Sequence, residues 1–186
     1  GYEAKLRSAK LSYYKGGFAL AQDHLAVLKE ATTREISNDA IHLSLLIKDN
    51  TGLDTSDYLM KKYSHIDLLL FQNKKEEALD SLNMMYKEYP GSSLTDEILW
   101  LQSKIYMEMG DFTKAIELLE IIQNEFADDI FGDDAFFRMA EIHDYHLKDI
   151  ETAKSLYQEL LVKYPGSVYA AEARKRFRKL RGDLIN

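Results

Sequence analysis

The sequence contains no cysteine, only 2 prolines and only 9 glycines in 186 residues. The absence of cysteine excludes disulfide bonds, thiolate metal sites and cysteine nucleophiles. So few prolines and glycines argue against an all-β fold, because a chain of short strands needs turn residues about every 8–12 positions. Apolar runs such as 68–71 are far shorter than the roughly 18 residues of a membrane-spanning helix, so we expect no transmembrane segment.

The charge of the chain is acidic, with 24 Lys and Arg against 31 Asp and Glu and a formal net charge of -7. Such a surface repels a phosphate backbone, so nucleic acid is not an expected partner. Hydrophobic residues make up 46% of the chain, which is enough for a sizeable core and excludes a disordered tail. The sequence has no nucleophile elbow, no phosphate-binding glycine loop and no zinc-protease helix motif, so we expect neither an enzyme nor a cofactor.

A repeat is present in the second half of the sequence. Ala78, Ala115 and Ala153 are separated by 37 and 38 residues, and each follows a polar turn. An aromatic residue stands eleven positions after each alanine, at Tyr89, Phe126 and Tyr164. A shared period that carries the same internal spacing three times indicates a repeat array.

The apolar residues between these positions recur with a helical period, as in the segment 150–164. Each repeat therefore predicts two antiparallel helices that bury their apolar faces against neighbouring helices. The pattern predicts an all-α chain of about ten helices, at 2–15, 17–31, 37–50, 55–72, 75–89, 93–109, 111–126, 132–147, 149–164 and 167–181. We divide the chain into irregular N-terminal helices that continue the array (1–57), three repeats (58–166) and a C-terminal capping helix (167–186).

These helix pairs resemble the tetratricopeptide repeat, whose pattern the last copy matches with Phe137, Ala140, Ala153, Tyr157 and Pro165. The resemblance implies a right-handed superhelical solenoid of antiparallel helix pairs and a non-enzymatic module for protein–protein interaction. The Tyr-Pro-Gly-Ser joints at 89–92 and 164–167 are similar to repeat domains of bacterial envelope proteins, such as the Tol-Pal coordinator and the outer-membrane-protein assembly lipoprotein. This likeness implies a periplasmic or envelope setting rather than a cytoplasmic one.

The family geometry also implies a concave face lined by the first helix of each pair. The residues that it places there, as a surface for a protein or peptide partner, are Tyr63, Asp67, Trp100, Lys104, Arg138, Ile142, Tyr145 and His146. Exposed aromatic residues beside charges suit partner binding, because they contribute a large contact area at a low entropy cost. The alternative for Trp100, which lies among Ile98, Leu99 and Leu101, is a place in the core.

A second candidate surface is the basic C-terminal helix. Its cations are Arg174, Lys175, Arg176, Arg178, Lys179 and Arg181. They could bind an acidic partner or an anionic membrane surface, or they form the solvated cap that ends a repeat array. His143 and His146 could offer two imidazoles to zinc, but no third ligand is identifiable, so we expect no metal site.

The function that these features favour is a non-catalytic scaffold that binds a protein partner, in a bacterial envelope complex. The alternative is a structural or oligomerisation module at one end of a longer repeat protein, which allows a homo-oligomer. Because the chain begins with Gly1 rather than methionine, we expect its native start, with any signal peptide, to have been trimmed.

Overall fold

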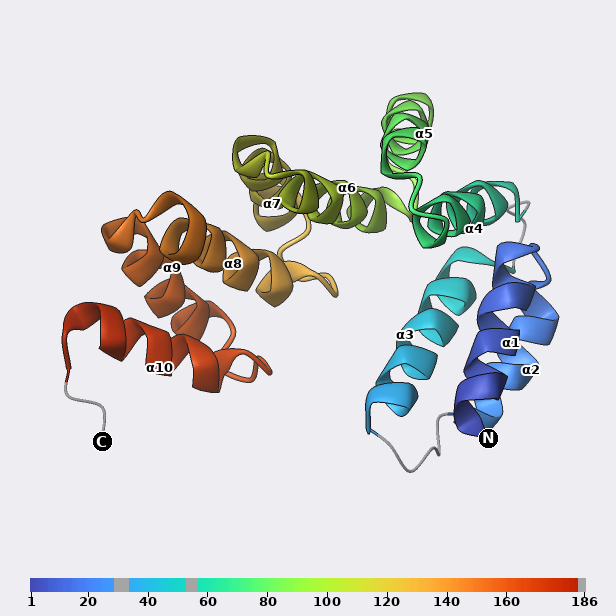
Figure 1. The fold of residues 1–186 in the computed structure, drawn as a ribbon, viewed down its shortest axis with the longest axis horizontal. Coiled ribbons are helices and arrows are strands. Elements are labelled where there is room, and N and C mark those ends of the chain that lie inside the picture. The colour runs from blue at the N-terminus through green and yellow to red at the C-terminus, as the bar shows by residue number, and fades with distance from the viewer. Residues whose placement is uncertain (29–33, 53–56, 184–186) are drawn as a thin grey trace. The chain divides into compact units, whose positions relative to one another are not determined.

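The chain is an all-α protein in the computed structural model, which describes residues 1–28, 34–52 and 57–183 (Figure 1). These residues form ten α-helices and one short π-helix, and they contain no strand. The elements are α1 (Tyr2–Tyr14), α2 (Phe18–Leu28), α3 (Arg34–Asn50), α4 (Tyr58–Phe71), α5 (Lys75–Glu88), α6 (Thr95–Met109), α7 (Phe112–Glu125), α8 (Gly132–Glu141), η1 (Ile142–Leu147), α9 (Ile150–Lys163) and α10 (Ala170–Arg181). The predicted all-α fold of paired antiparallel helices is therefore confirmed.

The predicted helix positions agree closely with the observed ones, with two informative differences. The segment 132–147 is not one α-helix, because it changes to the wider π-helical turn at Ile142. The last helix begins at Ala170 rather than 167, after a turn in which the Tyr169 N–H donates a hydrogen bond to the Ser167 hydroxyl (3.1 Å). The predicted helix ends at 31 and 55 lie outside the described residues. None of the described helices is both long and apolar enough to cross a membrane.

The chain divides into two compact units, Gly1–Leu94 and Thr95–Asn186, called here the N-terminal and C-terminal units. The division lies inside the segment 58–166 that the sequence predicts as three repeats, so the predicted segmentation describes repeats rather than compact units. In the N-terminal unit, α1 and α2 form a hairpin and α3 packs against both (Figure 1). Reciprocal hydrogen bonds between the Gln22 amide and Ser44 join α2 to α3 (2.8 and 2.7 Å).

The three repeat alanines occupy equivalent places. Ala78, Ala115 and Ala153 are all fully buried, each in the first turn of the second helix of its pair. The residue five positions earlier has a left-handed backbone in each copy, with φ of 60° at Asn73, 78° at Gly110 and 57° at Lys148. The repeat found in the sequence is thus a repeat of local structure, namely a left-handed turn followed by a buried alanine.

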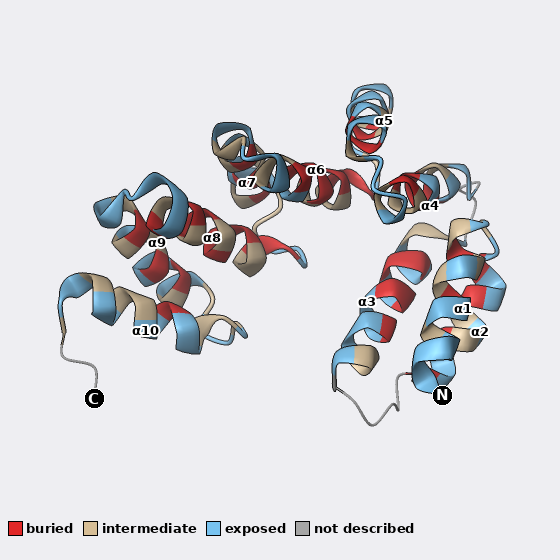
Figure 2. Cartoon of the chain, viewed as in Figure 1, coloured by how far each residue is buried: buried red, intermediate tan, exposed pale blue. Residues whose placement is uncertain are grey.

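The C-terminal unit contains two such helix pairs followed by α10. An apolar cluster lies where α8, α9 and α10 meet, and the buried faces of α8 and α9 point toward each other (Figure 2). The buried members of this cluster are Phe136, Phe137, Ala140, Ala153, Tyr157, Leu160 and Ala173. The two helix pairs are joined closely, because the Tyr164 hydroxyl after α9 donates a hydrogen bond to the Ala127 carbonyl after α7 (2.8 Å), beside the buried Gly132.

Candidate functional site

The predicted concave-face residues of the N-terminal unit do not form an open surface. Tyr63 is only 5% exposed and belongs to the core, so its prediction as a partner-binding residue is wrong. The reason is register, because α4 buries Met60, Tyr63 and Ile66, so its core-facing side includes the position that the family geometry implied to be exposed. Asp67 accepts a hydrogen bond from the Tyr13 hydroxyl (2.7 Å) and so ties α4 to α1.

One predicted concave-face residue of the C-terminal unit is also buried, at the point where α8 changes to the π-helix η1. Ile142 is fully buried, so it cannot contribute to a binding surface, and that prediction is also wrong. Trp100 is half-buried and stacks on Phe131 with ring centroids 5.1 Å apart. Its exposure is therefore intermediate between the two predicted roles, a partner-binding residue and a core residue. Arg138 pairs with Glu141 on its own helix, and Lys104 is exposed.

Two of the predicted concave-face residues, both in η1, have rings that reach the surface. Tyr145 is 43% exposed, and its ring lies under the Arg176 guanidinium at 4.5 Å. His146 is exposed and stacks on Phe112 at 4.1 Å. Both rings are held by neighbours within the C-terminal unit, and their role in partner binding stays a prediction.

The basic helix α10 offers fewer free cations than the sequence suggests. Arg176 is not part of a surface patch, because its guanidinium forms a buried ion pair with Asp144 and donates through Nε at 2.9 Å. Arg178 and Arg181 both pair with Asp183. Within the described chain, the cations of α10 that have no carboxylate partner are Arg174, Lys175 and Lys179, and all three are exposed.

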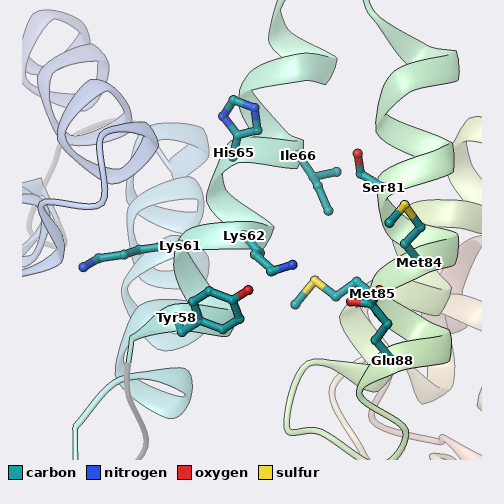
Figure 3. A pocket seen from close by; sticks show the side chains of 9 residues that line it. All are labelled: Tyr58, Lys61, Lys62, His65, Ile66, Ser81, Met84, Met85 and Glu88. Carbon is teal, nitrogen blue, oxygen red and sulfur yellow. The ribbon is translucent and has the colours of Figure 1, made fainter.

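The site that sequence reasoning missed is a groove between α4 and α5. It has a volume of about 520 Å³, which lies within the range of about 300–1,000 Å³ that is typical of ligand sites. Its lining residues come from both helices and are Tyr58, Lys61, Lys62, His65, Ile66, Ser81, Met84, Met85 and Glu88 (Figure 3). The groove lies entirely inside the N-terminal unit.

The polar end of the groove is organised around Lys62. Its side chain extends from α4 toward α5, whereas Lys61 points away from the groove (Figure 3). The Lys62 ammonium lies 5.1 Å from the Tyr58 ring centre and 5.7 Å from that of Tyr89, within the range of cation–π attraction. The two rings meet edge to face at 6.3 Å. A hydrogen bond with Tyr58 raises the pKa of Lys62, so the amine keeps its charge at neutral pH.

The apolar end of the groove is formed by one isoleucine and two methionines. Ile66 and Met85 are 3% and 2% exposed and form its floor, while Met84 is 60% exposed at its edge. Methionine is flexible and polarisable, so such a surface can adapt to apolar side chains of different shapes. The arrangement can therefore hold an apolar group beside a fixed cation.

One sequence signal could have indicated this groove. Ser81, Met84 and Glu88 lie on one face of the helix 75–88, next to its core face, and Met84 is the apolar residue on an otherwise polar stripe. A single exposed apolar residue is common on protein surfaces, so the signal lies in its position next to the buried floor of the groove. Among the residues that the structure describes, no group of three or more metal-ligating side chains comes together.

A protein-family model described as the tetratricopeptide repeat protein 21 ARM repeat matches residues 13–160. The matched segment covers most of the chain and includes all three repeat alanines and the α4–α5 groove. No curated protein matches the sequence.

Proposed function

The chain belongs to the tetratricopeptide repeat protein 21 ARM repeat family, and from this premise we propose that it is a non-catalytic scaffold that binds a protein partner in the α4–α5 groove. Helical repeats of this kind typically act as interaction scaffolds, because stacked helix pairs present extended surfaces to a partner. The family does not indicate which surface is used. The observation that carries the proposal is the groove, which is lined both by exposed Met84 and by Lys62, whose ammonium lies over the Tyr58 ring.

The groove has the composition of a protein-binding site. The exposed apolar surface of Met84 and Tyr58, which are 60% and 50% exposed, provides the binding free energy when a partner covers it, and the polar residues at the edge of the groove orient the partner. Methionine-rich grooves accept side chains from helical or extended segments by repacking. A single apolar side chain of a partner that covers Met84 and contacts Ile66 and Met85 would remove the exposed surface of Met84 from water.

A comparison of two aspartate variants tests the groove. Met84→Asp places a charge in the groove, whereas Val162→Asp places the same charge on α9, at a residue that is 74% exposed. We expect the unchanged chain and Val162→Asp to capture the same protein from the native host, and Met84→Asp to lose it. The captured protein, whether a different protein or a second copy of this chain, is then purified. Its Kd is measured for the unchanged chain, for Met84→Asp and for Val162→Asp. Equal affinity for the three chains would contradict the proposal.

The setting that we propose for this scaffold is a bacterial envelope complex, in the periplasm or associated with the envelope. The support is the likeness of the joints at 89–92 and 164–167 to repeat domains of envelope proteins. Fractionation of the native host with an antibody against the chain tests this setting. We expect the protein in the periplasmic or membrane fraction, and recovery with cytoplasmic markers alone would contradict it.

A further inference from the structure

We propose that the partner segment held in the α4–α5 groove carries an acidic side chain next to an apolar anchor, so that its carboxylate meets the Lys62 ammonium while the anchor covers Met84 and Met85. This inference rests on the proposed function and adds the chemistry of the partner.

The first support is the state of Lys62. Its ammonium is held over two phenol rings, at 5.1 Å from Tyr58 and 5.7 Å from Tyr89. In the described parts of the chain, no carboxylate forms an ion pair with it. A long cationic side chain that is already fixed loses little further conformational freedom when a carboxylate binds it. Lys62 is thus a preorganised cation that Glu88 attracts without forming an ion pair, and its ammonium is open to a carboxylate of a partner.

The second support is the distribution of charge around the groove. The α4 wall presents Lys62 and His65 and no acid, and the α5 wall carries one acid, Glu88. The chain as a whole has a net charge of -7, so this wall is a local exception on an acidic protein. An acidic segment is attracted to such a wall and repelled by most of the remaining surface, which favours this groove over other sites.

The third support is that the cation and the apolar floor line the same groove. Figure 3 shows the Lys62 amine pointing toward the α5 wall close to Met85 and Glu88, so the cation and the apolar floor face the same space. A ligand that uses both must present a carboxylate and an apolar group close together. A peptide segment with an acidic residue near a leucine, methionine or aromatic residue meets this requirement. Glu88 disfavours a second acid on the α5 side.

Selection from a random peptide library tests the inference directly. The baits are the unchanged chain, Lys62→Glu and Lys61→Glu, each first checked for unchanged helicity by circular dichroism. Lys61→Glu is a matched control, because it makes the same charge change at the neighbouring residue, whose amine points away from the groove (Figure 3). We expect the unchanged chain and Lys61→Glu to enrich peptides that combine an acid with an apolar anchor, and Lys62→Glu to enrich peptides with a lysine or arginine in place of the acid.

The affinity of one enriched peptide then gives the size of the effect. By fluorescence anisotropy, we expect Lys62→Glu to weaken the acidic peptide by about five- to tenfold and to strengthen its lysine-substituted version. Peptides that bind and are lost with Met84→Asp, but show neither an acidic preference nor this reversal, would overturn the inference and leave the proposed function standing. No enriched peptide, or binding that Met84→Asp leaves unchanged, would overturn both.

Discussion

Replacing Arg176 by methionine should strongly destabilise the C-terminal unit. The Arg176 guanidinium pairs with Asp144, whose side chain is only 4% exposed, and donates to it through Nε at 2.9 Å. The Tyr157 hydroxyl donates to the same carboxylate oxygen at 3.2 Å. Burial, followed by the charge of Asp144, raises the pKa of Tyr157, so this hydroxyl remains a donor. The variant Arg176→Met therefore leaves a buried carboxylate with its hydroxyl donor but without its cation.

The expected loss follows from the burial of the pair. Removing one partner of a buried ion pair costs about 3–5 kcal/mol, because the remaining charge is uncompensated. The Arg176 side chain is 14% exposed, so water can approach it, and methionine preserves much of its packing. We therefore expect the lower end of that range, about 3 kcal/mol. For a chain of this length such a loss lowers Tm by roughly 6–12 °C.

Urea denaturation followed by circular dichroism measures this difference. The control is the triple variant Asp144→Leu, Tyr157→Phe, Arg176→Met, which replaces the whole polar group by apolar side chains. We expect it to unfold within about 1 kcal/mol of the unchanged chain, since buried ion pairs are often replaceable by apolar residues. A loss below about 1 kcal/mol for Arg176→Met, or a triple variant as unstable as the single one, would refute the reasoning.

Two further predictions concern the repeat joints and turns. Gly132→Ala should lower the free energy of unfolding by about 1–3 kcal/mol, measured by thermal unfolding, because the added Cβ would lie 2.1 Å from the Ala127 carbonyl oxygen. In the control Gly166→Ala, the added Cβ meets no atom within 4 Å. Equal stability of the two variants would contradict this prediction. Hydrogen bonds from Thr152 lower the pKa of Asp149 from 3.8, so its charge stabilises the folded state above that pH. The stability lost in Asp149→Ala should thus shrink below pH 3.8, and a loss that stays constant in acid would contradict it.

The fold was predictable from the sequence because its signal is local. The three alanines and their preceding turns recur with nearly constant spacing, and each alanine is buried. A helix pair of this kind is defined by residues within one period, so a single sequence is enough to find it. The helix bounds followed from the apolar period for the same reason.

The site was less predictable because it depends on contacts between distant residues. The sequence predicted Tyr63 as a surface residue, but the structure buries Tyr63 and places its neighbour Lys62 in the groove. Only the packing of α4 against α1 and α5 decides which of two adjacent residues is buried. Likewise, Arg176 and Asp144 are 32 residues apart, and no local pattern indicates that a cation of the basic helix forms an ion pair with a buried carboxylate.

The measurement that tests the central claim most directly is site-specific photo-crosslinking in the native host. A photoreactive amino acid replaces Met84 in the groove in one experiment and Val162 on α9 in the other, both exposed positions. We predict that position 84 crosslinks one defined protein segment, that adding Lys62→Glu weakens this product, and that position 162 gives no such product. Equal crosslinking from both positions, or a product from position 162 alone, would contradict the assignment of the α4–α5 groove as the binding surface of this scaffold.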